Sequence, residues 1–325
     1  MTIAGNGLIV IGENVNATRK IKATSPRIVR EGDQRGLAYT DLDGTDKRLD
    51  VTEAFPDDPA AERTAAIPHI AIALRHKNLD YLTWAIRAQE AAGAGIIDLC
   101  VDEMSHYPEE RAEWMRWLVR TAQAITGAVL AIDSSDPETI KAGLEVHDDS
   151  RARPAINSVS LEESRRVLID MAKARNAYIF ANASGRSGMP QNAEERVTNL
   201  REIMAMMDAA EIPMGDRFLD PLVFPIGANP EFGNHYLDAV RALRAEFPEV
   251  HIFGGHSNVS FGLPRRRLIN HGFIVLAVLA GCDTLMIDPL TNPAKDYVEL
   301  KYAFDVITAT DEYAVNYLRY CRARA

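Results

Sequence analysis

The chain has few cysteines and no long apolar run, and these two absences exclude several classes of protein. Its three cysteines in 325 residues are widely spaced and form no CxxC pair. This is not the cysteine density of a disulfide-rich secreted domain, so we expect a reducing compartment, the cytoplasm. The longest apolar run, 273–280, is far shorter than the ~18 residues that would suggest a membrane span. No basic region precedes the N-terminal apolar stretch, so we expect a soluble chain with no membrane partner.

Basic charge and the common catalytic motifs are also missing. A formal net charge of −10 argues against a non-specific nucleic-acid binder, which needs a basic surface to displace counterions. The sequence contains no GxGxxG or GxxxxGK[ST] loop, no HExxH motif and no Gly-x-Ser-x-Gly elbow, and its eight histidines are scattered. We therefore expect no nucleotide loop, no metal site and no hydrolase nucleophile. No lysine follows a late strand, which disfavours aldolase-type covalent catalysis.

What the sequence does contain is a regular alternation of short apolar runs and helical windows, from about residue 80 onward. The predicted strands are Leu8–Ile11, Ile96–Val101, Ala128–Ile132, Pro154–Ile156, Ala177–Phe180, Phe218–Val223, Ile252–Gly255 and Thr284–Ile287. The predicted helices include Leu79–Ala92, Glu109–Ile125, Ser164–Ala174, Glu194–Ala210, Ala294–Thr308 and Glu312–Ala323. Eight strands separated by helices predict an α/β fold, a closed TIM (β/α)8 barrel, rather than an open doubly wound sheet. We expect one domain over residues 1–325.

The segment 17–76 interrupts this alternation as a long excursion after the first strand. Its first half is basic and its second half acidic, and few of its apolar residues are in phase. A long connection of this kind is usually functional or mobile. An insertion at the barrel mouth could act as a lid or dock a partner, and the alternative is a solvated surface loop.

Polar residues recur where the apolar runs end, which is how a parallel barrel collects a binding site at one mouth. The set comprises Glu13, Asn14, Asn16, Asp98, Asp102, Asp133, Asn157, Asp220, Asn258 and Asp288. Carboxylates accept from the ring N–H and exocyclic amine of a planar heterocycle, and carboxamides donate to its acceptor atoms, so the set suits a pterin-like ring. The alternative for each is a helix N-cap, which is expected at such junctions.

Several local strings resemble a known family. The stretch Gly254–Pro289, GGHSNVSFGLPRRRLINHGFIVLAVLAGCDTLMIDP, closely resembles the seventh and eighth barrel segments of the methyltetrahydrofolate:corrinoid methyltransferases. These enzymes belong to the pterin-binding barrel superfamily, which also contains dihydropteroate synthase. IGENVN, AIDSSDPETIKAGLE, AINSVS and LDPLVFPIG resemble that family in the same order, and only 17–76 falls outside the resemblance.

The resemblance implies a role for individual residues. Asp133, Asn157 and Asp220 would hold the pterin, and Asn258 would lie near the folate N5 that carries the methyl group, as the catalytic hydrogen-bond donor. The remaining matches are Glu13 and Asn16 at the end of the first strand and Arg266 in the seventh segment. Arg266 could bind the folate tail or the partner surface, and a solvated turn after Pro264 is the alternative.

Three positions depart from the family pattern. Cys100 and Asp102 stand where members usually carry Asn and Gly, and His256 stands where Leu is frequent before the SNVS string. Cys100 could be a nucleophile or a metal ligand, but a buried structural thiol is the more common use. His256 could alter the hydrogen bonding around N5 or be a packed histidine.

The reaction that the resemblance implies moves a methyl group between N5 of tetrahydrofolate and the cobalt of a corrinoid. A network of Asn258, water and Asp98 could share the proton that N5 gains. The chain has no DxHxxG string, so cobalamin would come from a separate corrinoid protein, and the family suggests a homodimer. The rivals are a dihydropteroate synthase-like enzyme, a non-catalytic folate-binding subunit of a methyltransferase complex, and a metal-dependent barrel.

Overall fold

Eight strands form one sheet in the computed structural model, which describes residues 7–58 and 60–323. They are β1 (Ile9–Asn16), β7 (Ile96–Cys100), β8 (Val129–Asp133), β9 (Ala155–Val159), β10 (Tyr178–Asn182), β11 (Arg217–Asp220), β12 (His251–Ile252) and β13 (Thr284–Ile287). The sheet order is β12-β11-β10-β9-β8-β7-β1-β13, and an isolated parallel bridge joins Gly255, just after β12, to Met286 in β13. This bridge links the first and last strands of that order. The predicted (β/α)8 barrel is therefore confirmed, with all eight strands close to their expected positions.

The chain divides into two compact units, which are described separately. The N unit comprises 12–91 and 97–157, and the C unit comprises 1–11, 92–96 and 158–325. Helices of the N unit are α1 (His69–Arg75), α2 (Leu79–Ala91), α3 (Pro108–Ile125) and α4 (Pro137–Val146). Helices of the C unit are α5 (Val167–Arg175), α6 (Ala193–Ala209), α7 (Phe232–Glu246), α8 (Arg266–Ala280), α9 (Ala294–Ile307) and α10 (Val315–Arg322).

In the N unit, α3 and α4 begin as their sequences dictate. Each has a proline at its first position, where no backbone donor is needed. Asp136 caps α4 by accepting a hydrogen bond from the Glu138 N–H over 3.2 Å. The two helices pack against each other and against β8, so the strand end that carries Asp133 rests on a fixed support.

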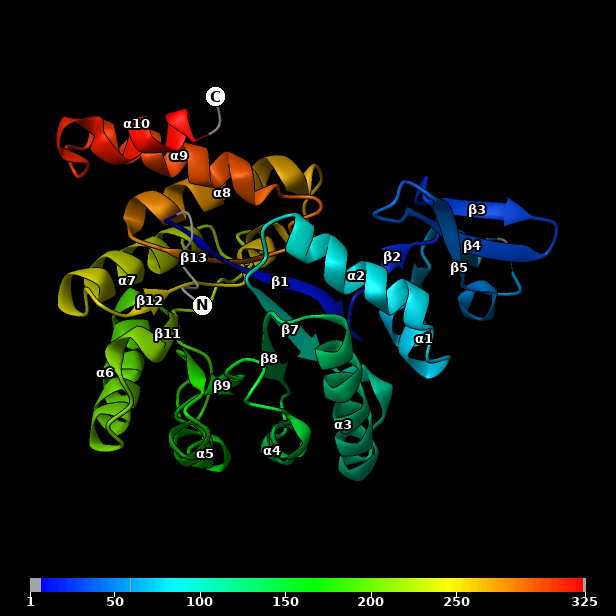
Figure 1. Ribbon diagram of the computed structural model, residues 1–325, viewed down its shortest axis with the longest axis horizontal. Helices are drawn as coiled ribbons and strands as arrows, with labels where there is room; N and C mark the ends of the chain where they lie inside the picture. Colours follow the sequence, from blue (N-terminus) through cyan, green and yellow to red (C-terminus); the bar gives the residue numbers. More distant parts are fainter. Residues whose placement is uncertain (1–6, 59, 324–325) are drawn as a thin grey trace. The chain divides into compact units, whose positions relative to one another are not determined.

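Packing in the C unit relies on aromatic residues. Phe180 of β10 contacts Phe218 of β11, and both lie near Phe253, with ring centroids 4.9 to 6.5 Å apart. All three rings are buried, and offset aromatic pairs of this kind add to area burial. At the end of the chain α10 lies beside α9 (Figure 1), where Tyr302 and Tyr320 stack with centroids 4.5 Å apart.

The segment 17–76 is more regular than the sequence suggested. It contains a three-stranded antiparallel sheet of β3 (Ile28–Glu31), β4 (Gln34–Thr40) and β5 (Asp46–Asp50), and a short pair of β2 (Ile21–Lys22) with β6 (Ala66–Ile67). Leu37, Leu49 and Val51 give this sheet a small buried face. The insertion starts at the carboxyl end of β1, where the Ala17 N–H donates to the Cys100 carbonyl over 2.9 Å.

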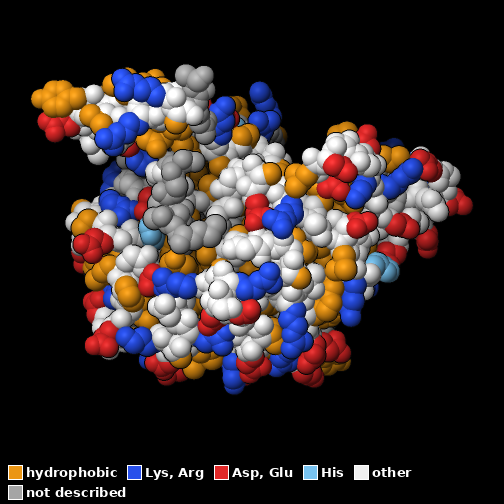
Figure 2. Space-filling view, viewed as in Figure 1, with side chains coloured by type: hydrophobic (Ala, Val, Ile, Leu, Met, Phe, Trp, Pro, Cys, Tyr) orange, Lys and Arg blue, Asp and Glu red, His pale blue; other side chains and the backbone are white. Residues whose placement is uncertain are grey.

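Ion pairs connect the first and second halves of the insertion. Arg30 pairs with Glu62 over 2.7 Å, and Arg48 pairs with Glu31 over 2.7 Å. Figure 2 shows acidic and basic side chains interspersed over the β3–β5 sheet. Exposed pairs of this kind add little stability, so the charges mainly keep the sheet's outer face soluble.

A glycine inside α4 sets the packing distance in the N unit, and its replacement tests the fold. A Cβ at Gly143 would lie 2.8 Å from Ile132 Cγ2 and 2.8 Å from Met115 Cγ. Gly143→Ala should therefore lower the free energy of unfolding by about 1 to 2 kcal/mol, because overpacking costs more than the gain in helix propensity. Gly272→Ala in α8 is the matched control, since its Cβ would meet nothing within 4 Å; it should stabilise by about 0.5 to 1 kcal/mol. Urea unfolding of both variants measures the difference, and equal effects would contradict it.

Candidate functional site

Strands β7, β8 and β9 bring three predicted site residues together in the N unit. Asn157 stands opposite Asp133 in the parallel register of β8 and β9. The Asn157 Nδ2 donates a hydrogen bond to Asp98 Oδ1 over 3.0 Å. Asp98 is fully buried, whereas Asp133 and Asn157 keep part of their surface exposed. This cluster offers both acceptors and donors at the strand ends.

The charge state of Asp98 is perturbed by its surroundings. Burial raises the pKa of Asp98 well above its ordinary value, and the charges of Asp133 and Glu13 raise it further, while the Asn157 hydrogen bond opposes the rise. The second oxygen, Oδ2, has no hydrogen-bond partner in 7–58 or 60–323. Asp98 therefore keeps its proton to a higher pH than an ordinary carboxyl and can hold or release it at Oδ2.

Two departures from the family pattern have structural explanations. Cys100 is buried, and burial raises the pKa of its thiol well above the ordinary value, which disfavours the thiolate that a nucleophile or metal ligand needs. Asp102 accepts from the Ser134 hydroxyl over 2.5 Å and from the Ser135 N–H over 2.8 Å. Asp102 thus fixes the turn that directly follows Asp133.

Glu13 and Asn16, at the end of β1, are already engaged with neighbouring residues. Glu13 pairs with Arg19 over 3.0 Å. The Asn16 Oδ1 accepts from the backbone N–H and the hydroxyl of Thr18 over 2.9 and 2.7 Å. Asn16 therefore shapes the turn into the insertion, and only its amide nitrogen is left for a ligand. Sequence patterns gave no sign of the Arg19 contact.

Asp220 ends β11 in the C unit and carries a strongly shifted pKa. Burial raises the pKa of Asp220 to about 7, against the opposing effects of the Leu222 N–H and the positive charge of Arg196. The Leu222 N–H donates to Asp220 Oδ1 over 2.8 Å. Arg196 is fully buried in α6, with Nη1 donating to the Asn192 carbonyl over 2.8 Å. The carboxylate consequently titrates near neutral pH.

Asn182 is a functional candidate that the sequence analysis missed. It ends β10 and stands opposite Asp220 in the β10–β11 register. Its Nδ2 donates to the Ser158 hydroxyl over 2.7 Å, and its Oδ1 accepts from the Ser184 N–H over 3.0 Å. The same strand-end rule that selected Asp220 applies to the run 177–181 before Asn182, so the signal was present in the sequence.

The departure at His256 is a packed core histidine. His256 is fully buried between Tyr236 and Phe273, and burial lowers the pKa of its imidazole to about 3, so the ring is neutral at physiological pH. The Tyr236 hydroxyl lies 3.4 Å from His256 Nε2 and 3.2 Å from Cys282 Sγ, and it donates to the Phe253 carbonyl over 3.0 Å. These contacts hold the loop after β12 rather than a ligand.

Asn258 lies in a short 3-10 helix, His256–Ser260, between β12 and α8. Its side chain is exposed, and its amide makes no hydrogen bond within the described ranges, which end at residue 323. The absence of a side chain at Gly255 leaves room for the Asn258 amide, because a Cβ at Gly255 would lie only 3.0 Å from Asn258 Nδ2. The amide is therefore available to a ligand.

Arg266 ties the start of α8 to the Asn258 loop. Its Nη2 donates to the Ser257 carbonyl over 2.6 Å, and its Nε donates to the Ser260 hydroxyl over 3.0 Å. Its guanidinium also lies over the Phe261 ring, 5.7 Å from the centroid. The structure thus gives Arg266 a positioning role that the sequence analysis did not foresee. Contact with the folate tail stays a prediction.

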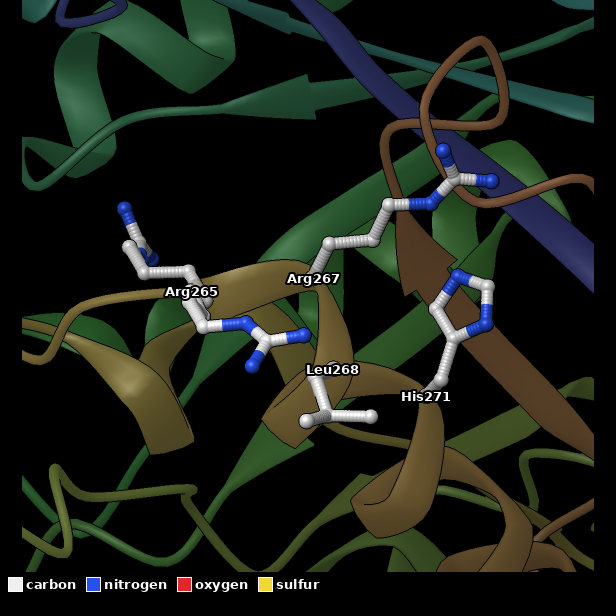
Figure 3. Close-up of a pocket in the computed structure, with 5 residues that line it drawn as sticks. Arg265, Arg267, Leu268 and His271 are labelled. Atoms are coloured by element: carbon white, nitrogen blue, oxygen red, sulfur yellow. The ribbon is translucent and has the colours of Figure 1, made fainter.

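A pocket of about 580 Å³ opens beside this loop in the C unit. Its lining residues are Arg265, Arg266, Arg267, Leu268 and His271, all at the start of α8 (Figure 3). Arg265 has a left-handed backbone, with φ of 52°, which is uncommon for a residue with a side chain.

No group of three or more His, Cys, Asp and Glu side chains within residues 7–58 and 60–323 is placed to hold a metal ion. None of the helices in those ranges combines the length and apolar character needed to cross a membrane.

Comparison with known proteins gives consistent matches. The sequence model of a family described as pterin binding enzyme matches residues 71–288. The methylcorrinoid:tetrahydrofolate methyltransferase of Eubacterium limosum is 27% identical over 255 residues, covering 78% of this chain and 91% of that protein.

Solved structures of Yersinia pestis dihydropteroate synthase are similar in fold. One, with a pterine-sulfa conjugate, has a TM-score of 0.57 at 17% identity and covers 71% of this chain and 90% of the other. A second, with a sulfonamide drug, has a TM-score of 0.58 at 14% identity and covers 92% and 94%. At these identities the structures support the fold alone.

Proposed function

Because the chain belongs to the pterin binding enzyme family, we propose that it moves a methyl group between N5 of tetrahydrofolate and a corrinoid carried by a separate protein. The 27% identical methylcorrinoid:tetrahydrofolate methyltransferase of Eubacterium limosum supports this reaction. The observation that carries the proposal is the exposed, unpartnered amide of Asn258 in the matching SNVS segment.

The pterin ring is bound by the strand-end acids and amides. We assign Asp133 and Asn157 to this role because they stand opposite each other on neighbouring strands and keep part of their surface exposed. Asp220 contributes a carboxylate that accepts from ring N–H and amine donors once it is ionised. Asp98, held by Asn157, supplies a group that can keep or release a proton at Oδ2.

Asn258 acts on the leaving nitrogen. A tertiary amine is a poor leaving group, so N5 must gain positive character or a stronger hydrogen bond as the methyl group departs. A donor that interacts more strongly with the transition state than with the ground state accelerates this step. The Asn258 amide can donate in this way. Hydrogen bonds from Arg266 hold the loop that carries Asn258 in place.

The corrinoid is the second methyl carrier and comes from outside the chain. Its cobalt supplies the nucleophile or the methyl donor, depending on direction. The insertion, with its mixed surface charges, is the proposed contact for the carrier protein.

A spectral assay tests the function. We expect the absorbance of Co(I) cobalamin to change on mixing with methyltetrahydrofolate and a catalytic amount of the chain. Folate binding by calorimetry without turnover would instead identify a folate-binding subunit. Turnover of a pterin pyrophosphate with p-aminobenzoate would identify a dihydropteroate synthase, and either result would overturn the proposal.

A further inference from the structure

We propose that the pocket at the start of α8 binds the oligoglutamate tail of the folate, so that the preferred substrates are folates with several γ-linked glutamates. This inference rests on the proposed function and names its substrate class. It concerns Arg265, Arg267 and His271, to which the reaction itself assigns no role.

None of the pocket's three arginines has an ion-pair partner within residues 7–58 and 60–323. Arg266 donates to Ser257 and Ser260, whereas the side chains of Arg265 and Arg267 make no hydrogen bond in those ranges. Many other arginines of this acidic chain are paired, as Arg241 is with Asp238 over 2.7 Å. Adjacent unpaired guanidinium groups create a local positive potential that suits a ligand with several carboxylates.

An imidazole and an apolar side chain also line the pocket. His271 lies one helical turn after Arg267, and Figure 3 shows its ring close to the Arg267 guanidinium. Its Nε2 is buried and has no hydrogen-bond partner in the part of the chain that the structure describes. Leu268 is 64% exposed. A γ-glutamyl chain matches this lining, because carboxylates alternate along it with methylene groups.

The location favours a folate tail over other anions. Arg266 contacts the Ser257 carbonyl, directly before Asn258, so the arginines begin where the loop that carries Asn258 ends. A folate with N5 at Asn258 has its glutamates at the far end of the molecule, within reach of a neighbouring pocket. The positive end of the α8 dipole adds to the attraction.

Calorimetry with monoglutamyl and triglutamyl 5-methyltetrahydrofolate tests the inference on the full chain. We expect the triglutamate to bind about tenfold more tightly, as two added charge-assisted contacts would produce. In the double variant Arg265→Gln/Arg267→Gln the ratio of the two dissociation constants should fall to about twofold or less. Arg241→Gln, an exposed arginine of α7, is the control and should keep the ratio. Thermal melting checks that each variant is folded.

The outcomes separate this inference from the proposed function. Equal binding of the two folates by the unmodified chain would overturn the tail site, and so would a tenfold ratio that survives the double substitution. If neither folate binds, the proposed function fails as well. If the double variant keeps the ratio but loses association with the corrinoid protein, the pocket serves an acidic protein partner and the inference is wrong.

Discussion

Replacing Asn258 with alanine should reduce the rate of methyl transfer by about 10² to 10³-fold, the range found when a preorganised hydrogen-bond donor is removed from a reacting centre. Folate affinity should fall far less, because the amide acts mainly as N5 gains charge. Single-turnover kinetics give the rate and calorimetry gives the affinity. The substitution removes no hydrogen bond within the described chain, so the fold should be unaffected.

Asn234→Ala provides the matched control for this result. Asn234 is an exposed asparagine in the same unit, and its amide donates to Glu231 over 3.1 Å. Its loss should leave the rate unchanged. Equal losses of rate and affinity in Asn258→Ala would show that the residue binds substrate uniformly and has no catalytic role.

Asp220→Asn should weaken folate binding by about 10²-fold at pH 8, because a charge-assisted pair of hydrogen bonds is replaced by weaker neutral contacts. The effect should depend on pH. With a pKa of about 7, Asp220 must lose its proton before it accepts from the pterin, so wild-type affinity should rise from pH 5 and level off above pH 7. The variant should lack this rise. Calorimetry across that range measures both.

The same substitution should have the opposite effect on stability. The folded-state pKa of Asp220 lies above the ordinary value of 3.8, so the folded chain binds more protons than the unfolded chain between these values. This residue therefore makes the wild type less stable as pH rises from about 4 to 7. Relative to wild type, Asp220→Asn should be more stable at pH 8 than at pH 5 in urea unfolding. A pH-independent difference would show that Asp220 titrates normally.

Strand ends were the most predictable part of this molecule. Apolar runs followed by Asp or Asn indicate the positions of β8, β9 and β11, although β9 continues past Asn157 to Val159. Asp133 ends β8, whereas Asp98 and Asn157 lie inside β7 and β9, and the structure brings the three residues together. The rule that an apolar run ends in Asp or Asn also applies to Asn182, which the list of candidate site residues did not include.

Contacts between distant residues were not predictable. Arg196, buried beside Asp220, reads in sequence as an ordinary polar residue of an amphipathic helix. Arg266 appeared to be a ligand contact, and its bonds to Ser257 and Ser260 depend on how the loop folds back. The insertion was hidden because its strands are short and bury only a few side chains each.

The two ends of the insertion lie next to each other within the N unit. Ile21 pairs with Ile67 and Lys22 pairs with Ala66, so β2 and β6 run side by side at its base. When the two ends of a segment are adjacent, a change in its length adds little entropic cost of loop closure. Such a segment can be shortened, lengthened or exchanged without changing the path of the barrel strands. The family match begins only at residue 71. This geometry makes the insertion a modular appendage, suited to evolutionary diversification while the pterin-binding scaffold stays constant.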